Sequence, residues 1–142
     1  LRRQRQMCIE TEIHAAIGLA QLPKLETFNR QRITNARYFS ARLRNVITPQ
    51  VPAGYRHVFH QYTIRVPGNR DALAEGLRQR GIATGIYYPL PIHQQTLYQQ
   101  MGYDGHFPVA EQMSREVLSL PVHPALTPEE RDLIVQAVNE LV

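Results

Sequence analysis

A proline inside an otherwise helical pattern constrains this chain most. From Thr11 to about Asn45, apolar residues recur at helical spacing, and arginines crowd the polar faces of the second half. Pro23 interrupts the pattern, because it donates no backbone hydrogen bond and its ring crowds the preceding turn. The sequence therefore predicts two helices end to end, or one long helix that is kinked near Pro23.

The residues after this helical segment predict short strands. Residues 57–66 alternate apolar and polar side chains with a period of two, and His60 falls on the same face as Tyr62, so we expect His60 to pack in the core. Residues 82–88 predict a second strand. Residues 120–123 predict a short strand or an extended edge.

Three further helices are predicted. One covers residues 70–80, a short one follows His93 and ends at about residue 101, and one covers residues 109–118. Asn69 is a candidate N-cap for the first of these, and Gly81 its C-terminal stop. The last helix has the clearest signal, because Thr127-Pro128-Glu129-Glu130 combines a capping box with proline at the first helical position.

This order of elements predicts an α+β fold, with a small antiparallel or mixed sheet covered by helices and preceded by a long N-terminal helix. We divide the chain into residues 1–47, which form the helix, and residues 48–142, which form the small α+β domain. The length of 142 residues suits one domain that buries a real core.

Composition favours an intracellular protein outside the membrane. The longest apolar stretch, residues 15–20, is far shorter than the roughly 20 residues that span a bilayer. Nothing resembles a secretory signal, and the single cysteine, Cys8, excludes an internal disulfide. We expect a cytoplasmic location and no membrane partner.

The charge is uneven, with nine Lys/Arg against three Glu in residues 1–44 and seven Lys/Arg against nine Asp/Glu afterwards. A basic helix could contact nucleic acid, although a solvated helix face is the simpler interpretation. Zinc-finger, RNP and KH motifs are absent, so we expect no nucleic-acid partner. His57 and His60 would point to opposite faces of a strand, which argues against a metal pair.

Several short sequence motifs occur along the chain, one after another. They are TEIHAAIGLAQL at residues 11–22, HVFHQYTIR at residues 57–65, GIATGIYYPLPIH at residues 81–93, and FPVAE with LSLPVHP at residues 107–111 and 118–124. Together, and in this order, these motifs resemble those of the DegT/StrS-type nucleotide-sugar aminotransferases. The resemblance implies a pyridoxal-phosphate (PLP) enzyme of fold type I, of which this chain would be the C-terminal small domain.

The resemblance also implies a homodimer that transfers an amino group, commonly from glutamate, to a keto-sugar on a nucleotide, in polysaccharide or amino-sugar biosynthesis. The Schiff-base lysine and the acidic partner of the cofactor nitrogen would lie in an N-terminal domain that this chain lacks. Lys24, the only lysine, lies outside the family's lysine context. We therefore assign no catalytic or cofactor-binding residue here, and expect the chain alone to be inactive.

The beginning of the chain departs from the family. It starts with Leu1 rather than methionine, which suggests a fragment. The family's Asn-x-Arg-Met would fall near Met7 and Ile9, neither of which can contact a phosphate. Residues 1–10 are therefore divergent, or are not the native junction with the missing domain.

Tyr88 and His93 are the candidate substrate-binding residues. They flank the rigid Pro89-Leu90-Pro91 turn, which the resemblance places near the sugar end of the active site. A phenol and an imidazole suit hydrogen bonds to sugar hydroxyls or to a phosphate, although both could simply pack in a rigid loop. Two other functions remain open: a non-catalytic binding or regulatory module of the same fold, and a nucleic-acid binder that uses the basic helix.

Overall fold

The computed structural model describes residues 2–142, with side chains described from Thr11 onward. Its elements, in chain order, are α1 (Arg2–Gln21), the 3-10 turn η1 (Leu22–Lys24), α2 (Leu25–Arg42), β1 (Tyr62–Arg65), α3 (Arg70–Gln79), the 3-10 turn η2 (Ile92–Gln94), α4 (Thr96–Gln100), α5 (Pro108–Glu116), β2 (Val117–Leu120) and α6 (Pro128–Leu141). The predictions made on residues 1–10 concern side chains outside the described set.

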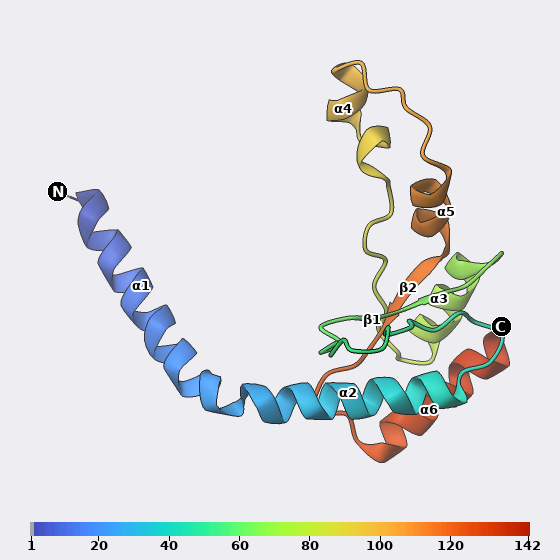
Figure 1. The fold of residues 1–142 in the computed structure, drawn as a ribbon, viewed down its shortest axis with the longest axis horizontal. Coiled ribbons are helices and arrows are strands. Elements are labelled where there is room, and N and C mark those ends of the chain that lie inside the picture. The colour runs from blue at the N-terminus through green and yellow to red at the C-terminus, as the bar shows by residue number, and fades with distance from the viewer. Residues whose placement is uncertain (1) are drawn as a thin grey trace.

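The long helix is interrupted where the proline predicts it. α1 ends at Gln21, and Pro23 lies in the η1 turn, after which α2 begins at Leu25. A proline ring cannot continue the α-helical ladder, so the chain changes direction here. Figure 1 shows α1 projecting away from the rest of the molecule at this bend.

The sheet has two antiparallel strands, which confirms the α+β class. Tyr62 of β1 pairs with Leu120 of β2, and Arg65 pairs with Val117. A single bridge extends the pairing on each outer side, from Ile47 to Arg65 and from Gly85 to Ser119. Four extended segments therefore lie side by side, although only the inner two are full strands among the residues described.

The strand predicted over residues 57–66 is correct only in its second half. Phe59 has a φ of 48°, in the left-handed region, and this conformation breaks the alternation before β1 begins at Tyr62. As a result Phe59 is buried and His60 is exposed. The prediction of His60 as a core histidine is therefore wrong.

Two further boundaries also differ from the sequence prediction. Residues 82–88 do not form a strand, because they pair with the sheet only at Gly85. The late strand is Val117–Leu120 rather than residues 120–123, and α5 ends at Glu116. Pairing with β1 buries Leu118, Ser119 and Leu120, and this tertiary contact overrides the local helical pattern.

The core lies between this sheet and three helices, α2, α3 and α6. The largest fully buried side chains come from all of these elements: Tyr62, Phe39, Ile64, Leu73, Leu77, Leu118 and Val138. The predicted capping box also starts α6, with Thr127 accepting from the Glu130 amide and donating its own amide to the Glu130 carboxylate. The division at residue 47 stays a prediction.

A long excursion leaves the sheet after Gly85 and returns at Val117. Figure 1 shows η2, α4 and α5 projecting from the sheet, on the side away from α2 and α6. Its outgoing end is tied by the Gly85 bridge, and its returning end by an ion pair of 2.8 Å between Arg65 and Glu116. Arg70 adds hydrogen bonds to the backbone oxygens of Ser114 and Val117. Both ends of the excursion are therefore held against the core.

The described apolar side chains of α1 and of Leu22, which begins the η1 turn, are uncovered. Ile13, Ile17 and Leu22 are 57%, 55% and 63% exposed. An uncovered face of this kind favours association with another surface. No helix in the described part of the chain combines the length and the apolar character that crossing a membrane requires.

We predict that the 142-residue chain self-associates when it is purified alone, because the described residues leave this α1 face uncovered. The double substitution Ile13→Glu and Ile17→Glu should weaken the association, as measured by light scattering over a concentration series. Leu133→Glu, at a half-exposed position of α6, is the matched control. A wild-type monomer at high concentration would contradict the prediction.

Candidate functional site

The two candidate residues line one cavity within the excursion. This cavity of about 900 Å³ includes Tyr88 and His93 in its wall, and most of the remaining wall is apolar or aromatic. Tyr88 is 78% exposed and makes no hydrogen bond to the residues described. The structure thus brings the two side chains to a common hollow, while leaving the Tyr88 hydroxyl available.

The backbone between them is shaped by two prolines. Pro91 has φ −61° and ψ 153°, and the η2 turn starts directly after it. The Gln94 amide then donates to the Pro91 oxygen at 3.0 Å. Because the φ of proline is restricted, the backbone just before His93 has little conformational freedom.

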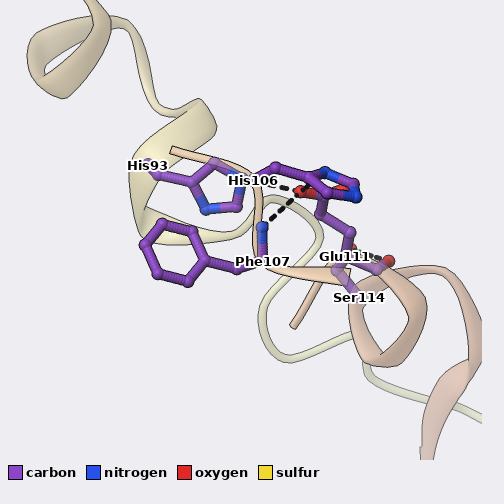
Figure 2. Close-up of polar contacts among 5 residues, drawn as sticks. All are labelled: His93, His106, Phe107, Glu111 and Ser114. Carbon is purple, nitrogen blue, oxygen red and sulfur yellow. Dashed lines mark hydrogen bonds and ion pairs between the residues drawn. The ribbon is translucent and has the colours of Figure 1, made fainter. Parts of the chain in front are cut away.

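His93 is held on two sides. Its side chain is only 13% exposed, and its Nε2 lies 3.1 Å from Oε1 of Glu111. Its ring centre is 4.9 Å from that of Phe107. Figure 2 shows the imidazole beside the Phe107 ring, with Glu111 approaching from the start of α5.

Glu111 is the centre of this cluster, and sequence reasoning did not single it out. Its Oε1 accepts from the Phe107 amide at 2.9 Å, from His93 Nε2 at 3.1 Å and from His106 Nδ1 at 3.1 Å. The sequence does contain a signal for its position, because Glu111 is an acidic residue in the first turn of a helix that begins with Pro108. Residues from both arms of the excursion therefore meet at one carboxylate oxygen.

These donors also set the charge of the carboxylate. The Phe107 amide is the largest cause of a lowered pKa at Glu111; His106 lowers that pKa further by its charge and a hydrogen bond, and His93 lowers it by a hydrogen bond. Desolvation by partial burial acts in the opposite direction and is second in size only to the Phe107 hydrogen bond, but the net effect is a lowered pKa. Glu111 is therefore an ionised acceptor at neutral pH.

The other histidines considered from the sequence do not join this site. His57 Nδ1 accepts from the Phe59 amide at 3.0 Å, and the exposed His60 lies beside a different cavity of about 330 Å³. Within residues 11–142, no three His, Cys, Asp or Glu side chains are grouped so that they could hold a metal ion.

Comparison with known proteins identifies the family. The profile of the DegT/DnrJ/EryC1/StrS aminotransferase family matches residues 10–139. The chain belongs to this family.

Three similar proteins illustrate the match. The pleiotropic regulatory protein of Geobacillus stearothermophilus is 41% identical over 91% of this chain and 36% of its own length. The UDP-N-acetyl-3-dehydro-alpha-D-glucosamine 3-aminotransferase of Acidithiobacillus ferrooxidans is 41% identical over 84% of this chain and 32% of its own length. The PLP form of Spr1654 from Streptococcus pneumoniae, described as a sugar aminotransferase, has a TM-score of 0.85 over 92% of this chain and 35% of that one, at 24% identity.

This member of the family spans about a third of the length of those relatives. Lys24 is exposed on the η1 turn between the two long helices, and it does not line any of the cavities of about 740, 330 and 900 Å³.

Replacing Glu111 by Gln should make stability less dependent on acid pH. Because the fold lowers the pKa of Glu111 from 4.5, its ionised form stabilises the folded chain above that pH, and the contribution disappears as pH falls through the lowered pKa. In urea unfolding, the wild type should exceed Glu111→Gln in stability at about pH 6, and the difference should shrink by about pH 3. Glu129→Gln, at an exposed carboxylate of α6, is the matched control. An equal difference at both pH values would contradict the assignment.

Proposed function

We propose that this chain works as the C-terminal part of a PLP-dependent sugar aminotransferase, which moves an amino group from glutamate to a nucleotide-linked keto-sugar. The observation that carries the proposal is the family match over residues 10–139. The name of the Acidithiobacillus relative supports a UDP-linked 3-keto sugar as the first substrate to test.

The chain's own contribution is to bind and orient the sugar. The excursion presents Tyr88 and His93 on one cavity wall, and the fixed Pro89-Leu90-Pro91 turn limits how far either can move. A phenol can donate or accept a hydrogen bond, and a neutral imidazole does both through different nitrogens. Accurate placement of such groups contributes to catalysis, because a misplaced substrate reacts slowly.

Two further surfaces support an assembly larger than this chain. The apolar face of α1 is exposed, and the excursion stands clear of the core with its cavity open. We propose that a cofactor-binding part of the same polypeptide and a second subunit of a homodimer cover these surfaces. Pyridoxal phosphate, when bound by that part, would supply the amino-group chemistry.

A second candidate function is a regulatory module without catalysis. The observation that favours it is the match to a protein named as a pleiotropic regulator, at 41% identity over 135 residues. The two candidates differ in whether a cofactor-loaded protein carrying this chain transfers an amino group.

Tyr88→Phe and His93→Ala should each slow amino transfer to the sugar. Each lost hydrogen bond to a neutral partner should cost about 0.5–1.5 kcal/mol, or roughly 2- to 12-fold in kcat/KM. The glutamate half-reaction, which does not involve the sugar, should change less. Both half-reactions can be followed separately by cofactor absorbance, in the polypeptide that carries this chain after a cofactor-binding part.

The matched control for these variants is Tyr55→Phe, at an exposed tyrosine beside a different cavity. Equal damage to both half-reactions would mean that Tyr88 and His93 support the fold or the cofactor rather than the sugar. Unchanged rates in both would leave them as packing residues.

The 142-residue chain alone should bind no pyridoxal phosphate covalently, because Lys24 lies on an exposed turn away from every cavity described. The purified chain is mixed with the cofactor, reduced with borohydride and examined by mass spectrometry, with Lys24→Arg as the control. A stoichiometric adduct on Lys24 would overturn the assignment of this lysine.

A further inference from the structure

The His93 ring has two nitrogens in different situations. Nε2 faces the carboxylate of Glu111 at 3.1 Å, whereas Nδ1 makes no hydrogen bond to any residue that the structure describes. An ionised carboxylate can only accept hydrogen bonds, so the nitrogen that faces it must carry a proton. In the neutral ring the proton therefore lies on Nε2, and Nδ1 keeps its lone pair.

We propose that Glu111 is a positioning residue, which holds neutral His93 as its Nε2–H tautomer and so presents Nδ1 as a hydrogen-bond acceptor to the sugar. The inference rests on the proposed function of His93. The sequence left open whether His93 binds a sugar hydroxyl or a phosphate. An acceptor nitrogen favours a hydroxyl or amino donor of the sugar. It does not suit an ionised phosphate, which has no hydrogen to donate.

Glu111 can impose this tautomer because its own position is determined elsewhere. Its Oε1 is held at 2.9 Å by the backbone amide of Phe107, four residues earlier, at the start of α5. The ring of Phe107 contacts the His93 imidazole at the same time. Phe107 therefore fixes the carboxylate and one side of the imidazole together, as Figure 2 shows.

The structure contains an internal control for this arrangement. His106 Nδ1 lies 3.1 Å from the same Oε1, but its side chain is 76% exposed and is not part of the cavity wall. Both histidines donate to one oxygen, and only His93 also reaches the cavity. Tautomer control for substrate binding should therefore depend on His93 and not on His106, whereas a loss of rate caused by loosening the start of α5 should also follow from removing the exposed His106 ring.

The direct test is to observe the tautomer. In the polypeptide that carries this chain and a cofactor-binding part, histidine can be labelled with ¹⁵N and the His93 signals assigned by their loss in His93→Ala. Two-bond ¹H–¹⁵N spectra at a pH where the ring is neutral should show the proton on Nε2. Glu111→Gln should give a mixture or the Nδ1–H form, because an amide can donate as well as accept. A proton on Nδ1 in the wild type, or an unchanged tautomer in Glu111→Gln, would overturn the proposal.

The functional test is a double-mutant cycle in the same polypeptide, with the UDP-linked 3-keto sugar as the probe. Glu111→Gln should lower kcat/KM for that sugar by about 2- to 12-fold, the range of one hydrogen bond. It should have almost no effect when His93 is already Ala, because coupled residues are not additive. His93→Asn, which keeps an acceptor oxygen near the position of Nδ1 without the contact to Glu111, should retain part of the rate and be insensitive to Glu111→Gln. His106→Ala should leave the rate near that of the wild type.

The outcomes distinguish a failure of the proposed sugar-binding role of His93 from a failure of the positioning role of Glu111. If His93→Ala leaves the sugar half-reaction intact, the proposed function of His93 fails and the inference fails with it. If His93→Ala slows that half-reaction but Glu111→Gln is without effect, or acts equally strongly in the His93→Ala background, the function of His93 stands and Glu111 has no positioning role. The same conclusion follows if His106→Ala slows the reaction as much as Glu111→Gln, since the effect would then come from the start of α5.

Discussion

The antiparallel pairing of β1 with β2 is the interaction on which the rest of the molecule depends. It joins Tyr62 to Leu120 across more than fifty residues of chain, and it places the buried side chains of both strands against α2, α3 and α6. β2 also accepts the bridge from Gly85 on its other side. The same strand thus completes the core and gathers both ends of the excursion.

Within the excursion, one carboxylate oxygen has the corresponding role. His93 lies on the outgoing arm, and Phe107 with Glu111 on the returning arm, so the hydrogen bonds to Oε1 join the two arms. Charge-assisted hydrogen bonds are stronger than neutral ones, and a side chain only 13% exposed is weakly screened by solvent. A site that stands clear of the core can therefore keep a defined shape without an extensive apolar core of its own.

The proposed function accounts for the apolar surface that the described residues leave uncovered. The two curated relatives described above are about three times as long as this chain, and the Streptococcus pneumoniae Spr1654 structure shares its fold. The α1 face and the excursion are the surfaces that the described core leaves free. Under the proposed function these two surfaces meet the cofactor-binding part and the second subunit, while the β1–β2 core holds them at a fixed spacing.

Local chemistry by itself determined several features correctly. Pro23 ends α1 because it has no amide hydrogen, Thr127 and Glu130 start α6 by a reciprocal cap, and Leu73 and Leu77 face the core at helical spacing. The short sequence motifs also indicated the family correctly. Each of these signals lies within a few residues, so no distant contact is needed to interpret it.

Tertiary structure alone decided the rest. The positive φ of Phe59 exchanged the buried and exposed positions before β1, the pairing with β1 turned residues 117–120 into a strand, and residues 82–88 kept a single bridge. Glu111 became the centre of the site only when the excursion folded back on itself and brought His93 to it from eighteen residues away. Sequence periodicity reports the face of one segment, whereas burial and the partner of a carboxylate depend on which distant segment arrives beside it.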